Sequence, residues 1–94
     1  MYHIKNFNKI MQAKIIKKLK DYFNPIILDV INESELHVGH EGSPNTGNSH
    51  FFIKMRSKKL NNLSRVEKQR LVYYVLKEEI KNGVHAIRMD VEGI

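Results

Sequence analysis

The hydrophobic residues at the start of this chain recur with the period of a helix. Met11, Ile15, Leu19 and Tyr22 lie at i, i+4, i+8 and i+11, and Ile16 and Phe23 widen the stripe. This spacing predicts an amphipathic helix whose outer face is rich in lysine. The helix is expected to end at Asn24-Pro25, because the residue before a proline is disfavoured in the helical conformation.

Three later segments have the features of strands. IILDVIN (26–32) is short and β-branched, HFFIKMRS (50–57) alternates apolar and polar residues, and VHAIRMDV (84–91) forms a last apolar segment. We expect Phe51, Ile53 and Met55 to face the core. The seventeen residues from 33 to 49 contain three glycines and one proline, which predicts a long irregular loop. Such loops in compact domains are usually functional or disordered.

A second helix is predicted over RVEKQRLVYYVLKEEIKN (65–82), with a short helical turn in the connection before it. Ser64 and Glu67 have the spacing of a capping box, and Asn82-Gly83 is a typical C-terminal stop. Its predicted buried positions are Val72, Val75, Leu76 and Ile80, with Val66 and Leu71 nearby. The predicted fold is α+β, a three-stranded sheet with helices packed on one face in the order α-β-β-α-α-β.

Length and composition limit the classes of protein to consider. At 94 residues, with 41% hydrophobic and 28% charged residues, the chain is expected to form one globular domain. We assign residues 1–10 to a basic N-terminal extension and residues 11–94 to that domain. The absence of cysteine excludes disulfides, thiolate zinc sites, cysteine nucleophiles and an iron–sulfur cluster held by this chain alone. No apolar segment approaches 18 residues, so we expect no membrane partner.

The net charge of +6 points to an anionic partner. Seven basic residues lie close together in the sequence with Glu67 as the only acid among them: Lys54, Arg56, Lys58, Lys59, Arg65, Lys68 and Arg70. They are compatible with one phosphate-binding surface and equally with two solvated faces. Gly39-His40-Glu41-Gly42 matches the GxxG of nucleotide-clamping KH domains, but it joins two predicted strands rather than two helices.

Histidine is the residue type best suited to metal chemistry in this chain. His37 and His40 lie in the predicted loop, His50 opens the second strand, and His85 opens the last. Neutral imidazole binds zinc, iron and copper, yet two loop histidines do not by themselves make a closed site. From spacing alone, His85 is either packed at the edge of the core or exposed at the entrance of its strand. No catalytic fingerprint is present, so the sequence does not predict an enzyme.

The chain resembles the BolA family from Met11 to Val91. The resemblance lies in NESELHVGHEG…NSHFFIKMRS and in LSRVEKQRLVYYVLKEEIKNGVHAI. Its most specific parts are Asn32-Glu33-Ser34, Ser49-His50-Phe51, Arg70-Leu71-Val72, Lys77-Glu78-Glu79-Ile80 and Val84-His85-Ala86. The family implies a class II KH-like fold and a non-enzymatic role in iron–sulfur cluster assembly or trafficking. It also implies a monothiol glutaredoxin as partner, with a [2Fe–2S] cluster shared between the two proteins.

The resemblance also implies which residues hold that cluster. The glutaredoxin and its glutathione are expected to supply thiolates, and this chain the remaining ligands. His85 matches the ligand of the terminal strand. Because cysteine is absent, the chain resembles the branch with a histidine in the loop, where His37 fits best and His40 is the reserve. His50 also matches a family histidine, which we interpret as structural or supporting.

Two further expectations concern partners. The basic residues Lys58, Lys59, Arg65, Lys68 and Arg70 are predicted to dock the partner protein or a nucleic acid, since bacterial members of the family are described as DNA-binding transcription regulators. Many members carry a histidine just before Arg-Leu-Val, where this chain has Gln69. That departure leaves the expected ligands intact. The alternative function is therefore a KH-like nucleic-acid-binding transcriptional regulator.

Overall fold

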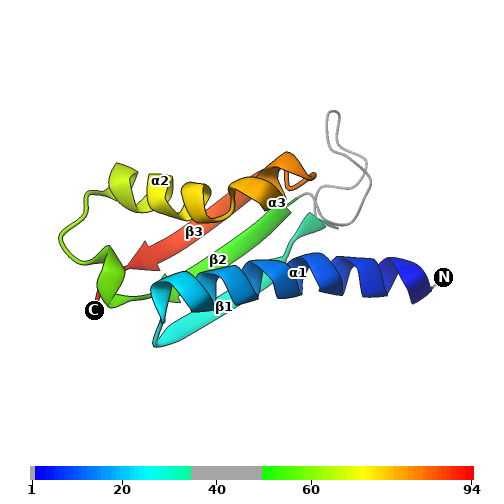
Figure 1. Cartoon of the computed structure of the whole chain (residues 1–94), viewed down its shortest axis with the longest axis horizontal. Coiled ribbons are helices and arrows are strands. Elements are labelled where there is room, and N and C mark those ends of the chain that lie inside the picture. Colours follow the sequence, from blue (N-terminus) through cyan, green and yellow to red (C-terminus); the bar gives the residue numbers. More distant parts are fainter. Residues whose placement is uncertain (1, 35–49) are drawn as a thin grey trace.

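The computed structural model describes residues 2–34 and 50–94, with side chains from residue 10 onwards. The chain forms, in order, α1 (Tyr2–Phe23), β1 (Ile27–Asn32), β2 (His50–Arg56), the 3₁₀ turn η2 (Lys58–Leu60), α2 (Arg65–Val75), α3 (Lys77–Lys81) and β3 (Ala86–Glu92). Figure 1 shows the helices on one side of a three-stranded sheet. The α+β fold and its order are therefore as predicted.

The sheet is mixed, with β2 in the centre. β1 pairs with β2 in antiparallel orientation, so that Asn32 lies opposite Phe51. β2 pairs with β3 in parallel orientation, which places His50 opposite Ala86. The parallel pair requires a crossover, and η2, α2 and α3 supply it on the helical face. As a result, the N-terminal ends of β2 and β3 meet the C-terminal end of β1 at one end of the sheet (Figure 1).

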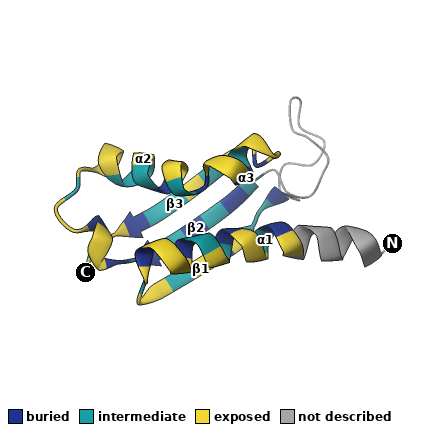
Figure 2. Cartoon of the chain, in the orientation of Figure 1, coloured by how far each residue is buried: buried dark blue, intermediate teal, exposed yellow. Residues whose placement is uncertain are grey.

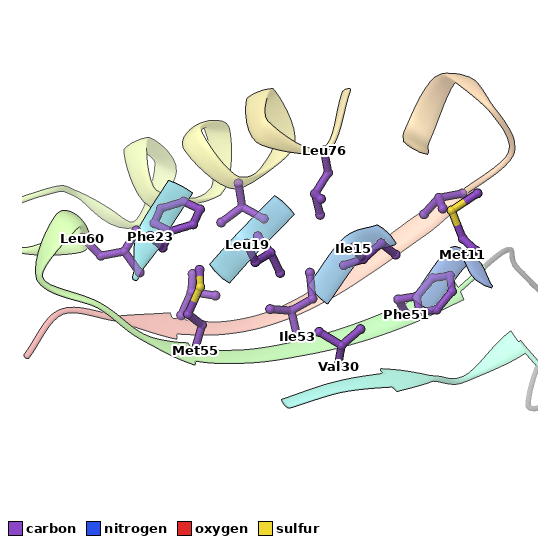
Figure 3. Packing of buried hydrophobic residues seen from close by; sticks show 13 residues of the cluster. Met11, Ile15, Leu19, Phe23, Val30, Phe51, Ile53, Met55, Leu60 and Leu76 are labelled. Carbon is purple, nitrogen blue, oxygen red and sulfur yellow. The ribbon is translucent and has the colours of Figure 1, made fainter. Parts of the chain in front are cut away.

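The core lies between α1, α2 and the inner face of the sheet (Figure 3). As predicted, β2 buries Phe51, Ile53 and Met55, while the alternate residues are only partly buried (Figure 2). The buried positions of α1 are Met11, Ile15, Leu19 and Phe23.

Tyr22 was expected in the core stripe of α1, and this prediction was wrong because its side chain is 40% exposed. Its ring contacts the edge of the Phe23 ring, with 4.9 Å between the ring centroids. Lys59 Nζ lies 5.1 Å from the centre of the Tyr22 ring. The stripe therefore repeats every four residues through Phe23, and Tyr22 forms part of the surface beside η2.

The ends of the helices follow the signals in the sequence. Asn24 has a φ of 45°, and its amide donates to the Lys20 carbonyl at 3.0 Å, so α1 ends directly before Pro25. Ser64 and Glu67 form the predicted capping box at the start of α2.

The predicted second helix is divided at Leu76, where φ is −100° and ψ is 17°. Leu76 is buried and Val66 is 52% exposed, so Val66 does not contribute to the core as expected. α1 starts at Tyr2 and passes through the predicted extension, so a domain boundary at residue 11 stays a prediction. None of the helices in the described part of the chain is long and apolar enough to cross a membrane.

Candidate functional site

Two histidines that are 35 positions apart in the sequence lie side by side where β2 and β3 begin. His50 is the first residue of β2, and His85 directly precedes β3. The parallel register pairs His50 with Ala86, which brings the two imidazoles together. Their ring centroids are 5.4 Å apart, and their planes are inclined at 55°. Neither the spacing nor the periodicity of the sequence predicts this contact, because it depends on the parallel pairing of β2 with β3.

The end of α3 explains why His85 is exposed. The Gly83 amide donates to the Ile80 carbonyl at 3.3 Å, and the Val84 amide donates to the Glu79 carbonyl at 3.1 Å. This bonding pattern is that of a glycine C-cap, and Gly83 has the positive φ, 126°, that it requires. The turn buries the side chain of Val84, and the next residue, His85, faces solvent.

This turn decides between the two alternatives that the sequence left open for His85, because the side chain is exposed at the entrance of its strand. A regular strand from Val84 would place His85 on the core face with Ile87. Because the ladder starts only at Ala86, the alternation does not extend back to His85.

Ser34 fixes the backbone of His50. Its hydroxyl accepts a hydrogen bond from the His50 amide at 3.2 Å and donates to the His50 carbonyl at 3.4 Å. Its own amide donates to Asn32 Oδ1 at 2.9 Å, and the Glu33 amide donates to the His50 carbonyl at 2.8 Å. Ser34 is 2% exposed. These bonds and its burial make Ser34 a structural residue of the site.

Glu33 and Arg88 form an ion pair next to His50. Arg88 contacts both carboxylate oxygens of Glu33, at 3.2 Å from Nε and 2.7 Å from the second guanidinium nitrogen. The hydrogen bond to Glu33 raises the pKa of Arg88 above the ordinary value of a guanidinium group. The guanidinium carbon also lies 4.3 Å from the centre of the Phe52 ring, a cation–π contact.

A shallow pocket of about 180 Å³ lies at this end of the sheet and is lined by Glu33, His50, Phe51, Ala86, Ile87 and Arg88. Arg88 could not be recognised from the sequence, because its position beside Phe52 depends on the register of β3 against β2.

Of the predicted ligands, only His85 lies within the described residues, and its side chain is exposed. His37 and His40 lie outside the described residues, so the ligand assignment stays a prediction. Within residues 10–34 and 50–94, no group of three or more histidine, cysteine, aspartate or glutamate side chains is arranged to hold a metal ion. The described part of the site thus offers two imidazoles and no thiolate. This donor set fits a cluster or ion for which other ligands come from elsewhere.

The predicted docking residues lie toward the opposite end of the sheet from His85. Lys58 and Lys59 are on η2, which follows the C-terminal end of β2. The seven residues of β2 span about 20 Å, and this length separates the two lysines from His50. The other three are on α2. Lys68 is in an ion pair with Glu92, with 2.6 Å between Nζ and Oε1, while Arg65 and Arg70 are exposed. The basic surface and the histidine pair are therefore separate features of the fold.

Comparisons with known proteins agree on one family. The profile of the BolA-like protein family matches residues 19–93. The chain is 40% identical over 78 residues to a protein of Vibrio cholerae named DNA-binding transcriptional regulator BolA, covering 83% of this chain and 70% of that protein.

Two solved structures from Arabidopsis thaliana match at 30% identity. The match to BolA1 has a TM-score of 0.77 and covers 87% of this chain and 89% of the BolA1 chain. The match to the BolA domain of SufE1 has a TM-score of 0.79 and covers 87% of this chain and 90% of the SufE1 domain. None of these three descriptions names an enzymatic activity.

Proposed function

Because the chain belongs to the BolA-like family, we propose that it is a non-enzymatic adaptor in iron–sulfur cluster assembly or trafficking. In this proposal it binds a monothiol glutaredoxin, and the two proteins share a [2Fe–2S] cluster. His85 and His37 are the ligands from this chain, with His40 in reserve. The glutaredoxin and its glutathione supply the thiolates that this chain lacks.

The exposed His85 is the observation that carries the proposal. The glycine C-cap of α3 presents its imidazole to solvent at the end of the sheet where residues 33–49 connect β1 to β2. His37 follows Ser34 by three residues, and three residues span at most about 11 Å. Ser34 itself is bonded to the backbone of His50, which is beside His85. In this proposal, the short sequence separation between Ser34 and His37 allows the loop ligand to reach the cluster beside His85.

The donor set also explains why the partner is needed. Thiolates are the usual ligands of [2Fe–2S] clusters, and imidazoles replace two of them in clusters of higher reduction potential. A chain with accessible histidines and no cysteine could supply the imidazole ligands of such a cluster, and a partner would have to supply the thiolates. Imidazole must be neutral to bind, so cluster retention is expected to decrease under acidic conditions.

The decisive experiment is anaerobic reconstitution of the chain with a monothiol glutaredoxin, glutathione, iron and sulfide. We expect a heterodimer whose visible absorption and circular dichroism differ from those of the glutaredoxin reconstituted alone. His85→Ala and His37→Ala should each change these spectra, while His3→Ala, at a histidine outside the proposed ligand set, serves as the matched control. If His85→Ala and His37→Ala both leave the spectra unchanged, the ligand assignment is wrong. Failure to form any heterodimer would contradict the adaptor function itself.

Nucleic-acid binding is the second candidate function. It is favoured by the name of the Vibrio cholerae relative, which describes a DNA-binding regulator, and by the exposed Arg65 and Arg70 on α2. Binding through phosphate contacts should weaken steeply as ionic strength rises, because bound counterions are released. Electrophoretic mobility of duplex DNA at several salt concentrations tests this. Absence of any shift at low salt would rule out the second candidate.

A further inference from the structure

The rings of His50 and His85 are separated by the distance that two imidazoles adopt around one tetrahedral metal ion. If each ring nitrogen is about 2.0 Å from the ion and about 1.1 Å from its ring centroid, a tetrahedral angle places the centroids about 5.1 Å apart. The observed separation is 5.4 Å. A square-planar arrangement of adjacent ligands would require about 4.4 Å.

From this geometry we propose that His50 and His85 chelate a single Zn²⁺ ion in the isolated chain, without a partner protein and with water completing the coordination. This site differs from the cluster site in its ligands, because it uses His50 and requires neither a loop histidine nor a thiolate. Imidazole is a preferred zinc ligand, and it also binds the neighbouring divalent ions nickel and copper.

The relative orientation of the two rings is also compatible with chelation. A plane angle of 55° excludes a parallel face-to-face stack. Each imidazole can rotate about its bond to the ion, so the plane angle need not change when the ion enters. An imidazole has two ring nitrogens, and one can bind the ion while the other keeps a hydrogen bond. A hydrogen bond on one nitrogen of either ring therefore leaves the other nitrogen able to bind the ion.

Both histidines are held by the backbone before any ion binds. His50 is fixed by the Ser34 hydroxyl and by the Glu33 amide. His85 lies between Val84, whose amide is bonded to the Glu79 carbonyl, and Ala86, which is paired with His50. Ligands that are already in place lose little conformational entropy on binding, and this favours a site with few ligands.

The surroundings leave access for a hydrated cation. His85 is exposed, and the pocket of about 180 Å³ extends beside His50. The nearest ionised groups of the pocket lining are Glu33 and Arg88, which neutralise each other in their ion pair. The guanidinium is further held over the Phe52 ring. The positive charge of Arg88, which would otherwise repel a divalent cation, is thus offset by Glu33.

The two proposals meet at His85, which cannot serve both metals at once. If the proposed function holds, Zn²⁺ bound to the isolated chain competes with the shared cluster, and a glutaredoxin must displace it. This consequence depends on the proposed function, whereas zinc binding by the isolated chain does not.

The test is a calorimetric titration of the isolated full chain with Zn²⁺. We expect one ion per chain, and we expect His50→Ala and His85→Ala each to weaken binding by at least about tenfold. The matched control replaces the other three histidines, His3, His37 and His40, with alanine together. This variant keeps only the proposed pair and should bind within about threefold of the unmodified chain. Thermal unfolding of every variant checks that it is folded.

Cobalt provides a direct check of the geometry. Bound Co²⁺, which substitutes for Zn²⁺ in tetrahedral sites, should give intense visible d–d absorption bands in the triple-alanine control, and His50→Ala introduced into that control should abolish them. The proposal is overturned if His50→Ala binds Zn²⁺ as well as the unmodified chain. It is equally overturned if the triple-alanine control loses binding, since the pair would then be insufficient. Loss of cluster formation in His37→Ala with unchanged zinc binding would separate this site from the proposed function.

Discussion

The amide of Val84 donates to the carbonyl of Glu79, and this one bond at 3.1 Å determines that the next side chain, His85, points to solvent. The bond depends on Gly83, whose φ of 126° lies in the region that only glycine adopts without strain. A C-cap usually has the sole role of ending a helix. Here it also presents His85, the proposed ligand, to solvent.

Replacing Gly83 with alanine should therefore disturb both stability and the site. We expect Gly83→Ala to lower the free energy of unfolding by about 1–2 kcal/mol, because an L side chain is strained at this φ. Chemical denaturation measures the loss, and the NMR signals of the His85 ring report its displacement. Asn82→Ala is the matched control, since Asn82 has a negative φ of −94°. Equal stability of the two variants would contradict the role given to Gly83.

A second prediction concerns the ion pair between Lys18 and Glu79. Lys18 Nζ is 3.0 Å from Glu79 Oε2, and the Glu79 side chain is only 6% exposed. Its other oxygen, Oε1, has no hydrogen-bond partner within the described part of the chain. Lys18→Met leaves this carboxylate buried without its cation, and we expect a loss of about 2 kcal/mol in urea denaturation. Glu79→Gln introduced into that variant should restore most of the loss, and no recovery would argue against the pair.

The buried serine between α1 and η2 supports a third prediction. The Ser57 hydroxyl donates to the Phe23 carbonyl at 2.6 Å and accepts from the Lys59 amide at 3.2 Å. Ser57→Ala leaves both groups without this partner, and we expect a loss of about 2 kcal/mol in the free energy of unfolding. The exposed neighbour Lys58 provides the control, and Lys58→Ala should change stability by less than about 0.5 kcal/mol. A similar effect of both changes would disprove the structural role of Ser57.

The capping box of α2 predicts a pH dependence. The Ser64 amide donates to Glu67 Oε1 at 2.8 Å, and this bond lowers the pKa of Glu67 below its ordinary value of 4.5. A carboxyl group whose pKa is lower in the folded state stabilises the fold fully above its unfolded pKa. That contribution is lost as the pH falls through the folded pKa. The difference in stability between the unmodified chain and Glu67→Gln should therefore shrink below about pH 4.5, and a constant difference would contradict the assignment.

Charge reversal on α2 tests the predicted docking surface. Arg65 and Arg70 are exposed, and the double variant Arg65→Glu/Arg70→Glu should weaken glutaredoxin binding by about tenfold. The control Lys14→Glu/Lys20→Glu makes the same change of charge at exposed positions of α1. Surface plasmon resonance at fixed ionic strength compares the two. Equal losses would indicate an effect of net charge rather than a docking surface on α2.

Local signals in the sequence predicted most of the fold. Asn24-Pro25, the Ser64–Glu67 pair and Asn82-Gly83 act on neighbouring residues, so the helix ends could be placed from the sequence. Tyr22 was misplaced because positions 22 and 23 are both compatible with the helical period, and only the packing against η2 distinguishes them.

The candidate site was predicted only in part. His85 was recognised through family resemblance, but its contact with His50 and the Glu33–Arg88 pair arise from strand pairings that no short segment encodes. His37 and His40 stay predictions, because they lie outside the described residues.

The parallel pairing of β2 with β3 also has a kinetic consequence. Each pair of register partners in these strands is 36 positions apart in sequence, such as His50 and Ala86. Contacts of this separation raise the contact order, and the entropy of closing such a long loop slows their formation during folding. The β1–β2 hairpin and the helices can form earlier from more local contacts. The histidine pair is therefore expected to assemble only when β3 docks onto β2. The ability of the chain to bind a metal ion would then show that folding is complete.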